Sequence, residues 1–271
     1  MQGVNSKVKL LKFLVKYVYA FFGCLGLFLG GVLLRQNRDL ISSLAIHFGY
    51  GKRKSISIPA LLPKIELAEL IRNNQPVKML EFFCRKGNVS LTELWVINQL
   101  IKQFDPKAVF EFGTFDGRTT LNMAANSCEN AIVYTIDLPK ESMNATKLLL
   151  CDHEKCLVDK QSSGEKYRKY LESKKIVQLY GDTATFNFDP YFNQMEFVFV
   201  DASHAYDYVM NDTRLALKLL KQGKGVILWH DYDAAFEGVT RALNELLAKE
   251  LSSLKNMRHI ENTSLAIMIN F

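Results

Sequence analysis

Short apolar runs alternate with helix-like stretches over the final two thirds of the chain, and this alternation constrains the fold most. The runs cover residues 108–112, 132–136, 176–180, 197–200 and 225–229. Helices are expected after Asp116, within 141–151 and 165–173, after Ala205 and after Phe236. Strands that alternate with helices in this way form a parallel sheet covered on both faces. The pattern therefore predicts an α/β, doubly wound, Rossmann-like fold.

The two ends of this region carry further signals. Ser90-Leu-Thr-Glu93 is a capping box that begins a helix running to about residue 104, and Asp105-Pro106 ends it. A short helix is expected at 64–73. Residues 256–260 and 265–270, joined by 261–264, indicate an antiparallel hairpin. The complete prediction is a mostly parallel seven-stranded sheet with a C-terminal antiparallel hairpin.

Acidic residues, glycines and histidines follow the ends of the predicted strands. In chain order the strand ends deliver Glu111, Gly113 and Gly117; Asp137; Asp182 and Thr183; Asp201 and His204; and His230 and Asp231. Ligands of such a sheet bind at the carboxyl ends of its strands, so we expect these residues to meet at one edge. A purely structural role does not account for charged residues after five successive strands.

The glycine turn narrows the choice of ligand. Residues 110–120 are FEFGTFDGRTT, which lacks the middle glycine of G-x-G-x-x-G and carries Asp116 where a phosphate would lie. Asp137 lies 24 residues beyond Gly113, the placement of a carboxylate that binds two ribose hydroxyls. The expected ligand has a ribose and an adenine, no phosphate and a positive charge. S-adenosylmethionine matches this description, whereas the missing glycine disfavours a nicotinamide-dependent oxidoreductase.

Residues 90–271 resemble a class I S-adenosylmethionine-dependent methyltransferase. The resemblance is closest to the small-molecule O-methyltransferase group that includes macrocin O-methyltransferases and cephalosporin hydroxylase-like proteins. It rests on VFEFGTFDGRTT, VYTIDLP, LYGDTATF, FVFVDASHAYDYVMNDTRLALKLLKQGKGVILWHDY and the C-terminal hairpin. The fourth stretch is the most specific, because acid-x-x-His-x-Tyr followed by a helix, a glycine and His-Asp recurs in that group.

The resemblance implies a role for each strand end. By position, Glu111, Gly113 and Gly117 would border the methionine part of the cofactor, Asp137 would bind the ribose, and Asp182 with Thr183 would flank the adenine. Asp201 would border the cofactor, take part in catalysis and hold a divalent ion together with His230 and Asp231.

Two implied roles leave alternatives open. Oxygen ligands are usual for Mg²⁺, so His230 favours Mn²⁺ or another transition ion, or a site without metal. His204 lies three residues after Asp201, where catechol-type methyltransferases carry a lysine base. An imidazole at this position could accept the proton of an acceptor hydroxyl. Alternatively, His204 caps the following helix or orients Asp201.

The N-terminus differs in composition from the rest of the chain. Residues 17–34 are an uncharged run of 18 residues, which as a helix would span roughly 27 Å. Residues 1–60 hold nine Lys and Arg against one acid, whereas the remainder is slightly acidic, which argues against a nucleic-acid partner. Because basic residues flank the run on both sides, a membrane anchor is expected, single-pass or monotopic. A cleaved signal peptide and a buried helix are the alternatives.

These features predict a membrane anchor at 1–36, a connector at 37–89 and a methyltransferase domain at 90–271, in which residues 138–175 form a lid or extra helices. The five cysteines show no disulfide spacing, which indicates a reducing compartment and a cytoplasmic catalytic domain. The predicted function is a membrane-associated methyltransferase that acts on a hydroxyl of a small molecule or glycan, with a homo-oligomer left open. A non-catalytic adenosylmethionine-binding membrane scaffold is the alternative.

Overall fold

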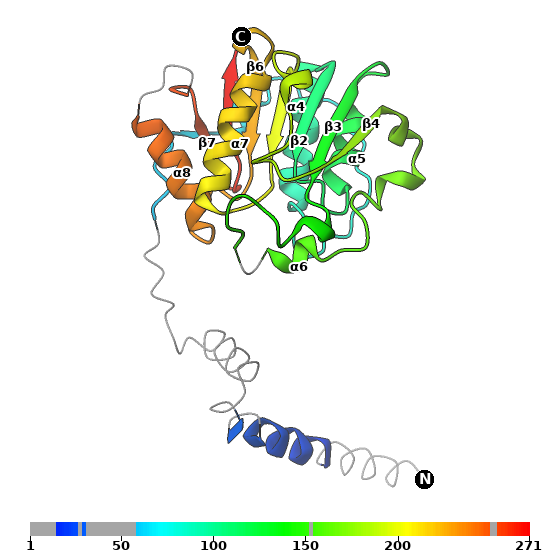
Figure 1. The fold of residues 1–271 in the computed structure, drawn as a ribbon, viewed down its shortest axis with the longest axis vertical. Helices are drawn as coiled ribbons and strands as arrows, with labels where there is room; N and C mark the ends of the chain where they lie inside the picture. Colours follow the sequence, from blue (N-terminus) through cyan, green and yellow to red (C-terminus); the bar gives the residue numbers. More distant parts are fainter. Residues whose placement is uncertain (1–14, 27–28, 31–57, 152–153, 250–253) are drawn as a thin grey trace. The chain divides into compact units, whose positions relative to one another are not determined.

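The computed structural model describes residues 15–26, 29–30, 58–151, 154–249 and 254–271 (Figure 1). The chain divides into two compact units, Met1–Ile56 and Ser57–Phe271. In the first unit, residues 15–26 and 29–30 are helical. Among the described residues, no helix has both the length and the apolar character needed to cross a bilayer. The predicted anchor at 17–34 is described only in part, because 27–28 and 31–34 lie outside these ranges.

An eight-stranded sheet forms the core of the second unit. In spatial order the strands are β1 (Lys64–Ile65), β7 (Arg258–Ile260), β8 (Ala266–Asn270), β6 (Gly225–Trp229), β5 (Phe197–Val200), β2 (Ala108–Phe112), β3 (Ile132–Asp137) and β4 (Ile176–Tyr180). Neighbouring strands pair in parallel except at β8, which runs antiparallel to β6 and β7. The predicted α/β fold with its C-terminal hairpin is confirmed, and the sheet is mixed.

The sheet has one strand more than the seven predicted, because the lead-in contributes β1. Lys64 and Ile65 fall within the predicted 64–73 helix, but they pair with His259 and Ile260 of β7. The helix α3 is confined to Leu67–Leu70. A hairpin leaves unpaired backbone groups along its outer edge, and β1 covers that edge.

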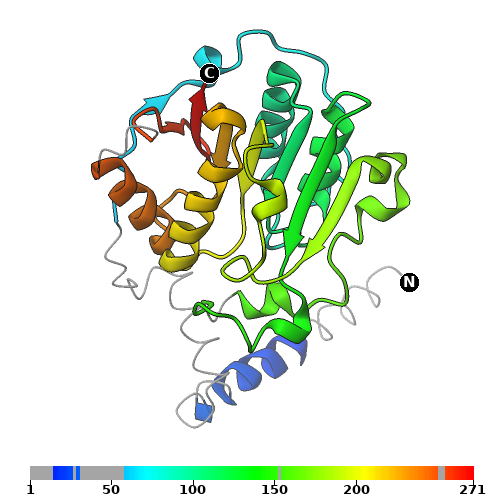
Figure 2. The ribbon, with the colours of Figure 1, turned by 45° about the horizontal axis from the view of Figure 1, so that its top comes forward.

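Helices cover both faces of the sheet (Figure 1 and Figure 2). On one face lie α4 (Leu91–Phe104) and α5 (Arg118–Asn126), and on the other α7 (Tyr206–Leu219) and α8 (Glu237–Ala248). Strand side chains alternate between the two cores, since Val109 and Phe197 pack with α4 whereas Phe110 and Val198 pack on the side of α7 and α8. Strands buried on both faces are continuous apolar runs, which is why the sequence locates them.

The connection between β3 and β4, residues 138–175, differs from the two helices predicted within it. Its described residues hold one short helix, α6 (Lys155–Val158), and 3-10 turns at Lys140–Ser142, Tyr167–Lys169 and Leu171–Lys175. Its backbone is bonded to the glycine turn instead, because Gly164 and Lys166 donate their N–H groups to the carbonyls of Phe115 and Asp116, both at 2.9 Å. These bonds use backbone donors that a continuous helix would need.

Candidate active site

A cavity of about 260 Å³ lies at the carboxyl ends of the central strands. Its lining includes eight of the ten predicted site residues: Gly113, Asp137, Asp182, Thr183, Asp201, His204, His230 and Asp231. They follow β2, β3, β4, β5 and β6 in turn. The structure therefore brings the strand ends together around one space. The other two predicted residues, Glu111 and Gly117, lie outside the lining.

The close packing of the chain itself requires glycine at position 113. Gly113 has a φ of 89°, and a Cβ there would lie 2.0 Å from the carbonyl oxygen of Asp201. The turn after β2 thus touches the backbone at the end of β5. A side chain at this position would separate two strand ends that both line the cavity.

Gly117 makes a contact other than the predicted one. It begins α5 with a φ of 82°. A Cβ there would lie 2.5 Å from Cδ1 of Tyr167 and 2.8 Å from Cα of Gly164. Gly117 therefore allows the connection 138–175 to pack on the glycine turn, and its predicted contact with the methionine part of the cofactor stays a prediction.

Glu111 is also placed differently from the prediction. Its side chain is buried, and the hydroxyls of Thr120 and Thr135 both donate to Oε2. Burial raises the pKa of Glu111 to about 8, against the lowering effect of the two hydroxyls. The carboxyl joins α5 to β2 and β3, and it lies outside the cavity lining.

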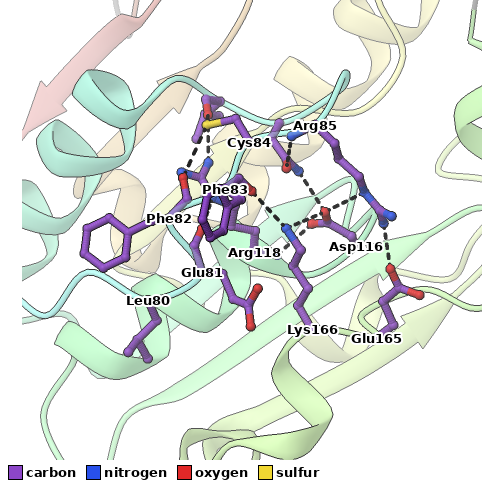
Figure 3. Close-up of polar contacts among 12 residues, drawn as sticks. Leu80, Glu81, Phe82, Phe83, Cys84, Arg85, Asp116, Arg118, Glu165 and Lys166 are labelled. Atoms are coloured by element: carbon purple, nitrogen blue, oxygen red, sulfur yellow. Dashed lines mark hydrogen bonds and ion pairs between the residues drawn. The ribbon is translucent and has the colours of Figure 1, made fainter. Parts of the chain in front are cut away.

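Asp116, the acidic residue of the turn, is neutralised within the protein (Figure 3). Its carboxylate lies 2.8 Å from Nε of Arg85 and 3.1 Å from Nζ of Lys166. It also accepts hydrogen bonds from the side chain of Asn88 at 3.0 Å and from the backbone N–H of Arg118 at 3.0 Å. A buried carboxylate is tolerated in this turn because two cations and two donors surround it.

The two carboxylates predicted to bind the nucleoside already have partners. Asp137 is half-buried at the end of β3, and its Oδ2 lies 2.9 Å from Nζ of Lys160. Burial raises its pKa, while Lys160 acts against that rise. Asp182 accepts bonds from the hydroxyl of Tyr208 at 2.9 Å and the N–H of Lys147 at 2.8 Å. Lys147 and Lys160 both belong to the connection 138–175, so this segment reaches both predicted cofactor carboxylates.

His204 is held between two carboxylates. Its Nδ1 lies 2.7 Å from Oε1 of Glu154, and its Nε2 lies 2.7 Å from Oδ2 of Asp231. Burial lowers the pKa of His204, but the two carboxylates outweigh that effect and raise it to about 10. The imidazole is therefore protonated at neutral pH in this arrangement. The role of general base stays a prediction; in this arrangement both ring nitrogens face carboxylates.

His230 joins the same chain of charges through Asp231. Its Nδ1 lies 3.1 Å from Oδ2 of Asp231 and 3.2 Å from Oδ1 of Asp201, and its Nε2 lies 3.3 Å from Oε2 of Glu93. Burial lowers the pKa of His230, but these carboxylates hold it well above its usual value. Glu93 is itself fixed, because the backbone and hydroxyl of Ser264 both donate to it at 2.8 Å.

The donor set of Asp201, His230 and Asp231 fits a divalent cation. One ligand atom from each of the three residues lies within 4.8 Å of the others. Glu93 holds Nε2 of His230, so that Nδ1 faces the two carboxylates, as in metal sites where a carboxylate orients a ligating histidine. Mixed nitrogen and oxygen donors suit Mn²⁺ or another transition ion better than Mg²⁺.

Comparison with known proteins agrees with this arrangement. Residues 110–232 match the model of a family described as Methyltransferase domain, and the matched range contains every strand end that lines the cavity. Residues 110–232 therefore carry the pattern of a methyltransferase domain.

Solved structures resemble this methyltransferase at low sequence identity. The O-methyltransferase of Bacillus cereus in complex with SAH is 15% identical, with a TM-score of 0.44 and coverage of 69% of this chain and 84% of that chain. The O-methyltransferase TomG of Streptomyces achromogenes, in complex with SAM and involved in tomaymycin synthesis, is 15% identical, with a TM-score of 0.48 and coverage of 85% and 97%. No curated protein matches the chain significantly. At these scores, the acceptor has to be inferred from this methyltransferase's own residues.

Four residues that line the cavity or contact a predicted site residue were missed from sequence: Asn88, Glu93, Glu154 and Lys160. Glu93 was interpreted only as a capping-box residue, and its burial is seen only in the structure. Glu154 and Lys160 lie in a connection without apolar periodicity, which carried no signal. Asn88 lines the cavity from the residues that precede α4.

Proposed function

We propose that the protein transfers the methyl group of S-adenosylmethionine to a hydroxyl of a small molecule or glycan at a membrane. The observation that carries this proposal is the single cavity into which five successive parallel strands deliver Gly113, Asp137, Asp182, Asp201 and the His230-Asp231 pair. Carboxylates outnumber cations in the lining, which suits a ligand with ammonium and sulfonium groups.

The residues present fit this cofactor. Asp137 is a half-buried carboxylate at the end of β3, and Gly113, which carries no side chain, lines the same cavity. In the proposal, Asp137 accepts the ribose hydroxyls, and Thr183 with the turn after β4 borders the adenine. When bound, the cofactor supplies a methyl group on a positively charged sulfur, and the chain's task is to align the acceptor oxygen behind it.

The acceptor side of the cavity is formed by the clamp of Glu154, His204 and Asp231. Asp201, His230 and Asp231 would hold the divalent ion, whose positive charge would favour the ionised form of an acceptor hydroxyl. His204 would donate a hydrogen bond to the acceptor when Glu154 moves away, and would take the hydroxyl proton only in its neutral form. In the transfer the sulfur–carbon bond breaks, an oxygen–carbon bond forms, and the hydroxyl proton leaves to a base.

Calorimetry with S-adenosylmethionine and S-adenosylhomocysteine, with and without Mg²⁺ or Mn²⁺, tests the proposal directly. We expect both nucleosides to bind, and Mn²⁺ to bind more tightly than Mg²⁺. If folded protein binds neither S-adenosylmethionine nor S-adenosylhomocysteine, the proposed methyltransferase activity is refuted. Tight binding without turnover over a panel of phenols, sugars and lipid-linked acceptors would favour the scaffold alternative. A full rate after thorough chelation would leave Asp201, His230 and Asp231 as a polar cluster without metal.

The N-terminal segment supports the membrane part of the proposal. Along the described helix, the side chains of Tyr17, Tyr19, Phe21, Phe22 and Leu25 are all exposed. Aromatic and apolar side chains next to lysines are typical of segments that enter a membrane interface. The spacing of the five cysteines in the sequence indicates no disulfide framework, as in proteins of a reducing compartment, so we place the catalytic domain in the cytoplasm. Flotation with vesicles tests attachment, and an alkaline carbonate wash separates an in-plane segment from a spanning one.

A further inference from the structure

Residues 81–89 form a loop (the 81–89 loop) that precedes α4 and contributes to the cavity wall. Lys86, Gly87 and Asn88 line the cavity. The two ends of the loop are held by Arg118, whose side chain is fully buried. Its Nε donates to the carbonyl of Glu81 and its Nη1 to the carbonyl of Val89, both at 2.7 Å (Figure 3). Because the buried guanidinium of Arg118 donates to two backbone carbonyls, it fixes the positions of the start and the end of this loop.

Further contacts fix the middle of the loop. The carboxylate of Asp116 contacts the side chains of Arg85 and Asn88. The ammonium group of Lys166 donates a hydrogen bond to the carbonyl of Phe83 at 3.5 Å. Glu81 adopts a φ of 56°, and its carboxylate lies 2.8 Å from Nζ of Lys169. The backbone is thus tied at both ends and between them, so the direction of its outer side chains is set by the fold.

The outer side chains of this fixed loop are aromatic and exposed. Phe82 is 60% exposed and Phe83 is 91% exposed. Leu171, 80% exposed, follows Tyr170, whose hydroxyl donates to Glu81 at 2.9 Å. Single exposed apolar residues are common on soluble proteins, but an adjacent pair held out by an anchored backbone indicates a contact surface. We call Phe82, Phe83 and Leu171 the aromatic patch.

Cations outnumber carboxylates in the two segments that carry the aromatic patch. In residues 81–89 and 165–172 the cations are Arg85, Lys86, Lys166, Arg168 and Lys169, and the carboxylates are Glu81, Glu165 and Glu172; the buried Asp116 pairs with Arg85 and Lys166. This local excess of positive charge contrasts with the slightly acidic composition of residues 61–271. Exposed aromatic side chains within a cationic rim match the interface of an anionic lipid bilayer, where rings enter among the headgroups and lysines meet the negative surface.

We propose that the aromatic patch docks on the surface of an anionic membrane. One wall of the active-site cavity is then a loop in contact with lipid, so the acceptor is an amphipathic molecule that resides in the membrane. The docking surface stands on its own observations, and only this assignment of the acceptor rests on the proposed function.

Fluorescence of a Phe83→Trp variant of the full chain tests the docking. The vesicles would contain phosphatidylcholine with about one third phosphatidylglycerol, so that their surface is negative, and their acyl chains would carry bromine as a short-range quencher. We expect quenching beyond that of wild-type Trp95 and Trp229, and less quenching on vesicles of phosphatidylcholine alone. Phe271→Trp is the matched control, because Phe271 is 69% exposed and follows β8, whose antiparallel direction ends it at the edge of the sheet away from the cavity. Vesicle-bound protein in which the two variants are quenched equally would overturn the proposal.

A second variant pair separates docking from folding and from the enzyme. Phe82→Ser with Phe83→Ser should leave the melting temperature and S-adenosylmethionine affinity unchanged, and should weaken the vesicle binding of the full chain about tenfold or more. Unchanged vesicle binding would sink the docking proposal. A blue-shifted Phe83→Trp spectrum without vesicles would show that protein covers the patch and would equally overturn it. Absence of nucleoside binding in wild type would instead refute the proposed function and leave the docking result intact.

Discussion

Among single residues, Asp137 offers the most direct test of the cofactor site. In Asp137→Ala the ribose hydroxyls lose charge-assisted hydrogen bonds of about 1.5–3 kcal/mol each, so affinity for S-adenosylmethionine should fall tenfold or more. Calorimetry measures this, with a melting curve to show that the domain folds although Lys160 loses its partner. Asp159→Ala is the control, because that carboxylate is 56% exposed and pairs with Lys140. Equal affinities in both variants would place the ribose elsewhere.

The charged clamp around His204 makes stability depend on pH. Its pKa is raised to about 10 from 6.5, so the folded state holds this proton more tightly than the unfolded state. The contribution is complete below about pH 6.5 and is lost as the pH rises to about 10. In metal-free protein, the unfolding free energy of wild type relative to His204→Gln should therefore shrink over this range.

Urea titrations at about pH 6 and about pH 9.5 measure that difference. His259→Gln is the control, since His259 contacts the Thr263 carbonyl away from the cavity. A difference that stays constant with pH would mean that His204 is neutral in the folded protein.

The residues that sequence could and could not locate differ in how they reach the site. Asp137, Asp201 and Asp231 follow apolar strands, and parallel strands must end at one edge, so their convergence was predictable. Glu154 and Lys160 reach the site only through the path of an irregular connection, which local pattern does not encode. The sequence spacing of a glycine or an acidic residue also does not tell whether that residue contacts a ligand or packs against another part of the chain.

At the scale of elements, the capping box of α4 supports both the helix and the site. Ser90→Ala removes the bond from the backbone N–H of Glu93 and should lower the unfolding free energy by about 0.5–2 kcal/mol, with metal affinity unchanged. Glu93→Ala should cost more stability and also weaken Mn²⁺ binding, because His230 and Ser264 lose their shared partner. Denaturation and metal titration of the two variants distinguish these effects. Equal metal affinity in both would confine Glu93 to capping.

Elements were predictable where burial alone decides them. The strands at 108–112, 176–180, 197–200 and 225–229 have the predicted bounds, because each is a short, largely apolar run; β2, β5 and β6 are also covered on both faces, whereas β4 lies at the edge of the sheet. The helices expected in 141–151 and 165–173 are wrong: near the second range Gly164 and Lys166 donate to the glycine turn, and in the first the N–H of Lys147 donates to Asp182. β1 was missed since two residues at an edge carry no periodicity.

At the scale of the whole molecule, the catalytic unit begins earlier than the predicted boundary at residue 90. The N–H groups of Leu61 and Leu62 donate to the hydroxyl of Tyr232 at 2.7 and 2.8 Å, and Asn244 donates to the carbonyl of Pro59. A chain beginning at Ser57 keeps these contacts, so we expect it to fold and to bind S-adenosylmethionine with wild-type affinity. A chain beginning at Ser90 loses β1 and the 81–89 loop and should unfold at a lower temperature and bind weakly. Matching behaviour of the two chains would contradict this boundary.

The ion pair between Lys160 and Asp137 has a kinetic consequence. If the ribose must replace Lys160 on Asp137, association proceeds in two steps, and the second is a first-order rearrangement of the chain. The observed rate in stopped-flow mixing should then level off as S-adenosylmethionine concentration rises, and Lys160→Met should restore a linear dependence. If the observed rate of wild type rises linearly up to the highest S-adenosylmethionine concentration, Lys160 leaves Asp137 at least as fast as the nucleoside associates. The speed of cofactor entry would thus be set by one side chain of the protein rather than by diffusion.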